Sequence, residues 1–142
     1  GLGDVYKRQT AVVMGDEVIA ESEINRLVNE VQFQIESMPR GSVTQIPSLV
    51  LLTQMVTSHL VLEAVLEEGL RAKGVVVTDA EVQAFKQTIF GQYGQQEIED
   101  QVALQQGVSL QELDAFMRLV YGRQALGEAT RRLPRRAGHS SN

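Results

Sequence analysis

Residues 11–26 read AVVMGDEVIAESEINR, and this stretch predicts how the chain begins to fold. A first apolar run ends at Gly15-Asp16, and a second run resumes at Val18. Glycine tolerates the positive φ of a tight primed turn, so the Gly-Asp pair predicts a β-hairpin. Ser22 is then placed to cap a helix whose apolar side chains recur at helical spacing, namely Ile24, Leu27, Val28 and Val31. The sequence therefore predicts a hairpin that leads into a capped helix.

Five helices are expected in all, and the first is the one that this opening begins. The first helix should run from Ser22 to Met38 and break at residues 39–42, which read PRGS. A second should begin at Pro47-Ser48 and end at Lys73, and others should occupy 78–90, 96–106 and 109–132. The predicted fold class is mainly α, with about five helices and one small N-terminal β-hairpin.

Two of these helices open on the same local pattern. KGVVVTDAEVQAF (73–85) and QGVSLQELDAF (106–116) each place a glycine at the end of one helix and a Ser/Thr-x-x-Glu sequence at the start of the next. In such a capping box the hydroxyl accepts from the third backbone N–H, and the glutamate reaches back to the cap. We expect both corners, at Thr78 and at Ser109, to be capped in this way by their own residues.

The segment LVLLTQMVTSHLVLEAVL (49–66) is apolar on most sides. Gln54, His59 and Glu63 interrupt it, and its unbroken apolar runs are far shorter than the ~20 residues that a bilayer requires. The pattern favours a central helix buried by its neighbours over a membrane span.

The chain has 142 residues, a length typical of one domain with a real core. Residues 1–9 are expected to be a non-native leader, 10–132 the domain, and 133–142 a basic disordered tail. Residues 10–130 carry seven basic and 17 acidic residues, a net charge of −10. An acidic body repels phosphate backbones, which argues against a nucleic-acid partner.

Nothing in the sequence indicates catalysis. Cysteine is absent, which excludes thiol chemistry and thiolate metal sites. His59 lies in the most apolar helix, where a lone histidine usually packs in a core, and His139 lies in the tail. The acids at 67–68 and 97–100 are expected to be solvated helix faces, because no loop has calcium-ligand spacing. We expect no enzyme activity, no cofactor and no bound metal.

A helix-turn-helix DNA reader is one alternative. ALQQGVS (103–109) matches the A-x-x-x-G-V-S turn of many such proteins. The helix that would enter the groove, however, begins with Glu112 and Asp114 and has no basic residue before Arg118. The capped corner is the better interpretation.

Binding of apolar polypeptide is the interpretation we favour. Methionine and aromatic side chains adapt to varied partners, although at helical spacing they more often fill a core. The candidate lining residues of an apolar cradle are Phe33, Met38, Phe90, Tyr93, Phe116, Met117 and Tyr121.

Four segments in order resemble the SurA N-terminal domain family of extracytoplasmic chaperones. They are AVVMGDEVIAESEIN (11–25), LVLEAVLEEGL (60–70), GVVVTDAEV (74–82) and GVSLQELDAF (107–116). The resemblance covers residues 11–132 and implies an ATP-independent holdase for unfolded or newly exported polypeptides in the periplasm or on the outer face of the cytoplasmic membrane.

Many members of this family carry parvulin isomerase domains, and this sequence shows no parvulin pattern. A fragment of a peptidyl-prolyl isomerase that has lost its parvulin domain is therefore a further alternative. In the family a distant C-terminal segment often completes the N-terminal domain. The resemblance thus implies that the hairpin edge here is exposed or pairs with a second copy in a homodimer. A signal or lipoprotein segment upstream would be the only membrane contact.

Overall fold

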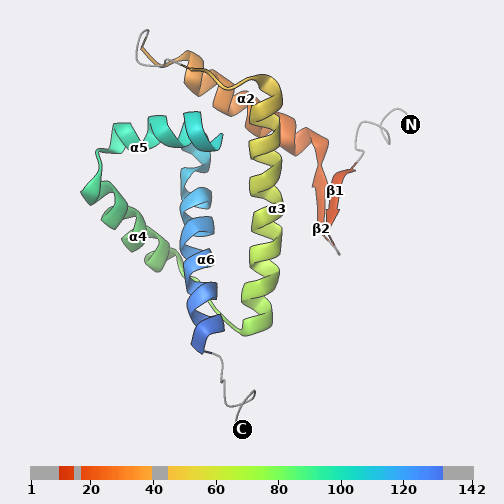
Figure 1. The fold of residues 1–142 in the computed structure, drawn as a ribbon, viewed down its shortest axis with the longest axis vertical. Helices are drawn as coiled ribbons and strands as arrows, with labels where there is room; N and C mark the ends of the chain where they lie inside the picture. Colours follow the sequence, from red (N-terminus) through yellow and green to blue (C-terminus); the bar gives the residue numbers. More distant parts are fainter. Residues whose placement is uncertain (1–9, 15–16, 40–44, 133–142) are drawn as a thin grey trace, which may run out of the picture.

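The computed structural model describes residues 10–14, 17–39 and 45–132 (Figure 1). Within these ranges the chain is mainly helical, with five α-helices and one two-stranded sheet, as the sequence predicts. The Gly15-Asp16 turn, most of the 39–42 break, the proposed leader and the proposed tail lie outside the described residues.

The N-terminal hairpin pairs β1 (Thr10–Met14) with β2 (Glu17–Ala20) in antiparallel register. Val13 lies opposite Val18, and an irregularity interrupts the register between Thr10 and Val12. The predicted hairpin is confirmed. The strand pair lies beside helix α3 (Leu49–Lys73) and leads directly into the first helix.

Helix α2 (Glu21–Glu36) begins one residue earlier than the sequence indicates. Its N-cap is Ala20, which supplies no side-chain hydrogen bond, so the expected cap at Ser22 is wrong. Ser22 lies within the first turn, because β2 runs directly into the helix. The apolar stripe is as predicted and buries Ile24, Leu27, Val28, Val31 and Ile35.

Helix α3 (Leu49–Lys73) has the predicted boundaries. The Ser48 hydroxyl accepts from the backbone N–H of Leu51 at 3.1 Å, and Gly74 ends the helix in the left-handed conformation at φ +68°. Glycine has no Cβ to clash there, which is why it is favoured at this position.

The remaining helices fold back along α3. Helix α4 (Asp79–Gln92) leads through Tyr93 and Gly94 to α5 (Gln95–Gln101), which continues as a π-helical segment to Gln106. A 3-10 turn at Leu110–Glu112 then opens α6 (Leu113–Arg132). In Figure 1, α3 and α6 lie side by side, with α2 across the upper part of α3 and α4 and α5 beyond α6.

Two apolar cores hold these helices together. The first gathers Ile19, the stripe of α2, and Leu52, Val56 and Ala103. The second lies between α3, α4, α5 and α6, and its buried members are Leu66, Leu70, Val77, Val82, Ile98, Leu113, Met117 and Leu119. The hairpin and α2 thus pack in the first core, α4 and α6 pack in the second, and α3 contributes to both.

Helices α3 and α6 approach closely through two reciprocal leucine–glycine contacts. A Cβ added at Gly122 would lie 2.8 Å from Cδ2 of Leu66, and one added at Gly69 would lie 2.8 Å from Cδ2 of Leu126. Each leucine therefore fills the space that the facing glycine leaves. The order of these contacts shows that the two helices run in the same direction.

The expectation that α3 is buried by its neighbours is wrong. Only Leu52, Val56, Leu66 and Leu70 are buried, although α2, α6 and the hairpin all contact the helix. Its exposed apolar side chains are Leu49, Val50, Leu51, Leu62 and Val65. Among the described helices, α3 alone is long and apolar enough to cross a membrane by length and composition.

The two predicted capping boxes have different outcomes. At the first corner, the Thr78 hydroxyl accepts from the N–H of Glu81, and the Glu81 carboxylate accepts from the N–H of Thr78 at 2.9 Å, so the box is confirmed. At the second corner Ser109 makes no cap bond, so this prediction is wrong. Helix α2 supplies the partners of that corner.

Candidate functional site

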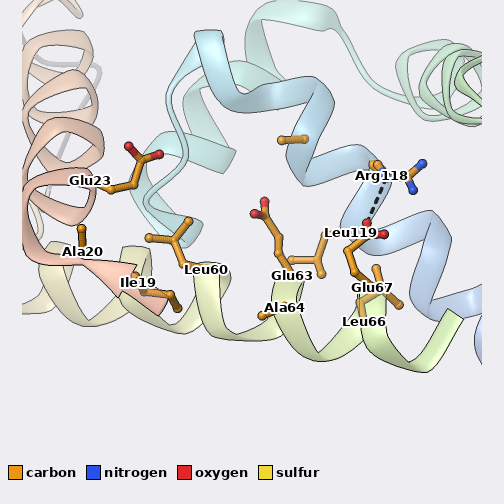
Figure 2. A pocket seen from close by; sticks show the side chains of 11 residues that line it. Ile19, Ala20, Glu23, Leu60, Glu63, Ala64, Leu66, Glu67, Arg118 and Leu119 are labelled. Atoms are coloured by element: carbon orange, nitrogen blue, oxygen red, sulfur yellow. Dashed lines mark hydrogen bonds and ion pairs between the residues drawn. The ribbon is translucent and has the colours of Figure 1, made fainter. Parts of the chain in front are cut away.

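Two open grooves and a smaller cavity lie around the contacts that α2 makes with the rest of the fold. We name the first the hairpin groove, because it lies where β2 and α2 meet α3 and α6 (Figure 2). It has a volume of about 470 Å³. The second, the corner groove, has a volume of about 500 Å³ between α2, α5 and the 3-10 turn. Both are large enough for one or a few side chains of a ligand.

The hairpin groove combines an apolar floor with carboxylates. The apolar part of its lining is Ile19, Ala20, Leu60, Ala64, Leu66, Ala115 and Leu119. Glu23, Glu63 and Glu67 add three acids, and Arg118 adds one cation. Figure 2 shows the Glu63 carboxylate directed into the space between α2 and α6.

The charged groups of the hairpin groove are unequally paired. Arg118 donates to Glu67 at 3.3 Å and to the Val77 carbonyl at 2.9 Å, and Glu23 accepts from Arg26 at 2.7 Å. Glu63 has no hydrogen bond or ion pair with any residue in the described ranges. Burial raises the pKa of Glu63, and the charges of the surrounding glutamates, Glu112, Glu67 and Glu23, raise it further.

The corner groove contains two of the predicted lining residues. Phe33 is 71% exposed, Met38 is half-buried, and exposed Leu110 adds a third large apolar side chain. Glu30, Glu99 and Asp100 form its acidic part. Gln34 links α2 to two other elements of the groove. Its side-chain oxygen accepts from the Leu110 N–H, and its side-chain nitrogen donates to the Glu99 carbonyl at 3.5 Å.

The other five predicted lining residues are not brought together in an open groove. Met117 is only 4% exposed and belongs to the second core. Phe90, Phe116 and Tyr121 are half-buried against that core, and Tyr93 is exposed where α4 ends. Aromatic spacing alone could not separate these positions, because a core stripe and a groove lining have the same helical period.

The smaller cavity has a volume of about 40 Å³, and most of its lining is apolar. His59, Glu63, Ser109 and Glu112 lie around it. The Ser109 hydroxyl, in a residue that is 1% exposed, donates to Glu30 at 3.1 Å. Burial raises the pKa of Glu112, as does the charge of Glu30.

His59 is a packed, hydrogen-bonded residue, as the sequence predicts. Its Nε2 lies 2.7 Å from the Gln106 carbonyl, so this nitrogen carries the proton, and its ring meets Phe116 edge-on at 5.4 Å. Its Nδ1 is buried without a partner among the described residues. Burial lowers the pKa of His59, because it disfavours the charged imidazolium.

The site residues that sequence reasoning missed include Glu23, Glu63, Glu67 and Leu110. The acids lie at ordinary helix-surface positions, and Leu110 lies inside the expected capping box, so no local pattern separates them from solvated neighbours. No group of three or more histidine, cysteine or acidic side chains that could hold a metal ion occurs in the part of the chain that the structure describes.

No family model, no curated protein and no solved structure matches this chain. The grooves therefore define the candidate site on their own geometry: apolar surface open to solvent, flanked by carboxylates. An arrangement of this kind can bind apolar or basic segments of another polypeptide.

Proposed function

We propose that residues 10–132 form an ATP-independent chaperone module that holds unfolded or newly exported polypeptides outside the cytoplasm. The observation that carries the proposal is the apolar surface left open in two acidic grooves and along α3. Large exposed apolar patches usually mark binding surfaces. The order of the SurA-like segments along the chain supports the same function.

Several weak contacts suffice for such a module. Each large apolar side chain that leaves water contributes roughly 1.5–3 kcal/mol. Two or three client side chains in the grooves therefore supply about 3–9 kcal/mol. Micromolar binding requires about 8 kcal/mol, so it needs several such contacts at once. The net charge of −10 over residues 10–130 would keep complexes soluble and disfavour acidic clients.

The first test is suppression of aggregation. A reduced, disulfide-dependent protein is allowed to aggregate without ATP, and light scattering is followed with and without the module. We expect the module to suppress scattering at stoichiometric excess. The absence of any effect would overturn the proposal.

Phe33→Ser should weaken this activity, since Phe33 is the most exposed large apolar side chain of the corner groove. Val76→Ser is the matched control, because Val76 is 77% exposed on the loop before α4 and lines no described groove. Equal activity of the two variants would contradict a role for the corner groove.

Duplex DNA at low salt tests the helix-turn-helix alternative. The start of α6 is tied to α2 through Gln34 and Glu30, and it presents Glu112 and Asp114. We expect no binding by the wild-type chain. Wild-type binding to duplex DNA would favour the alternative.

A further inference from the structure

The hairpin groove contains a carboxylate that has no counter-charge within the described protein. Glu63 is half-buried, and the one cation of the groove, Arg118, is held by Glu67 and by the Val77 carbonyl. Leaving a partly desolvated carboxylate unpaired costs free energy. A residue in this state is an acceptor that a bound cation would satisfy.

The surroundings of Glu63 indicate which kind of cation the groove would bind. Leu60 and Ala64 lie on the same helix face, one turn apart, and Leu119 lies opposite on α6. An apolar wall around an unpaired carboxylate suits a lysine or arginine side chain, whose methylene stem packs on apolar surface while its head remains polar. A hydrated inorganic cation would gain nothing from the apolar floor.

The strand that borders the groove favours a ligand with a backbone. Ile19 and Ala20 of β2 line the groove, and in the described part of the chain β2 pairs only with β1. No strand in that part of the chain occupies the other edge of β2, so an extended segment bound in the groove could add backbone hydrogen bonds to the side-chain contacts.

We propose that the hairpin groove binds a polypeptide segment in which one lysine or arginine is flanked by apolar residues, with its cation on Glu63. The inference rests on the proposed chaperone function and names the class of client segment that this groove selects. The charge selects the basic residue, and the floor selects its apolar neighbours.

The test compares two synthetic peptides. Both carry the same apolar flanks and a fluorophore, and they differ at one central position, which is lysine in one and norleucine in the other. Norleucine keeps the methylene stem and removes the ammonium group. Fluorescence anisotropy with the full chain gives the two dissociation constants.

We expect the lysine peptide to bind about tenfold more tightly, the ratio typical of one charge-assisted hydrogen bond. Glu63→Gln should abolish this preference. Glu97→Gln removes the same charge from the exposed face of α5 and should preserve the preference. Circular dichroism confirms that both variants are folded.

Ala64→Leu provides an independent variant that keeps every charge. The added side chain would occupy the groove, so both peptides should bind more weakly. Equal binding of the two peptides by the wild-type chain, or a preference that survives Glu63→Gln, would overturn the inference.

The outcomes also separate this inference from the proposed function. Suppression of aggregation without lysine preference would leave a chaperone whose clients bind elsewhere, which refutes the inference alone. A Glu63-dependent preference without suppression of aggregation would establish the peptide site and refute the holdase.

Discussion

The two helix–glycine–helix corners have nearly the same sequence pattern and are stabilised in different ways. Both place a glycine at φ +68° before a valine and a Ser/Thr-x-x-Glu sequence. At the first corner Thr78 and Glu81 satisfy each other through backbone and side-chain bonds. At the second, Gln34 accepts from the Leu110 N–H, and Ser109 donates to Glu30.

The difference follows from where each corner lies. Thr78 and Glu81 are exposed, so their best hydrogen-bond partners are each other. Ser109 is almost fully buried beneath α2, where a hydroxyl must find a partner and the carboxylate of Glu30 is within reach. A capping pattern therefore predicts where a helix begins, and tertiary packing decides which atoms cap it.

The largest expected effect comes from the two glycines. Gly74→Ala should cost about 1 kcal/mol, because alanine is strained at positive φ and no atom lies within 4 Å of the new Cβ. Gly107→Ala should cost about 2–4 kcal/mol, because its Cβ would also lie 3.0 Å from Cβ of Met55. Urea unfolding of both variants gives the comparison. Equal losses of unfolding free energy would show that the second corner accommodates the added methyl group without further cost.

Removal of the hydrogen bonds that cap each corner should destabilise a different part of the chain in each case. Thr78→Ala and Gln34→Ala should each cost about 1 kcal/mol. Amide hydrogen exchange should show lost protection at the start of α4 in the first variant. In the second it should show lost protection at Leu110, which is 76 residues away from the substitution. Changes confined to α2 in Gln34→Ala would contradict capping by α2.

Glu81 and Glu112 each lie three residues after the cap position of their corner. Ionisation of these two glutamates should change the stability of the fold in opposite directions. The hydrogen bonds from Thr78 lower the pKa of Glu81, so its stabilisation is present above pH ~4.5 and is lost as the pH falls. Burial raises the pKa of Glu112, so its ionised form destabilises the fold as the pH rises above ~4.5.

At neutral pH we therefore expect Glu81→Gln to lower the Tm. Glu112→Gln should raise stability by no more than about 0.5 kcal/mol, because solvent screens this half-exposed site. Both differences should shrink below pH ~4 as the carboxylates become protonated. Shifts of the same sign in the two variants would show that the corners are equivalent.

The smallest expected effect involves His59, whose Nε2 contacts the carbonyl just before Gly107. Its pKa is lowered in the folded state, so its contribution is complete above pH ~6.5 and is lost as the pH falls below that value. Mild acid should therefore destabilise the wild type by a few tenths of a kcal/mol relative to His59→Gln. Parallel pH profiles of the two proteins would contradict this assignment.

Sequence reasoning located the candidate site only in part. It selected Phe33 and Met38, which share the corner groove, because large adaptable side chains stand out in a chain built mainly from leucine, valine and alanine. It also selected Met117, which packs in the second core. It missed Glu63, because a carboxylate on an amphipathic helix is indistinguishable from a solvated one until the facing helices are known.

The sequence by itself determined the hairpin, the order and nearly all the ends of the helices, and the first capped corner. These features depend on residues that are close together in the chain, through alternation, helical spacing and local capping. The tertiary structure alone decided how the second corner is capped, which face of α3 remains exposed and which acid lacks a partner. Each of these depends on residues far apart in the sequence, and no local pattern records which helix packs against which.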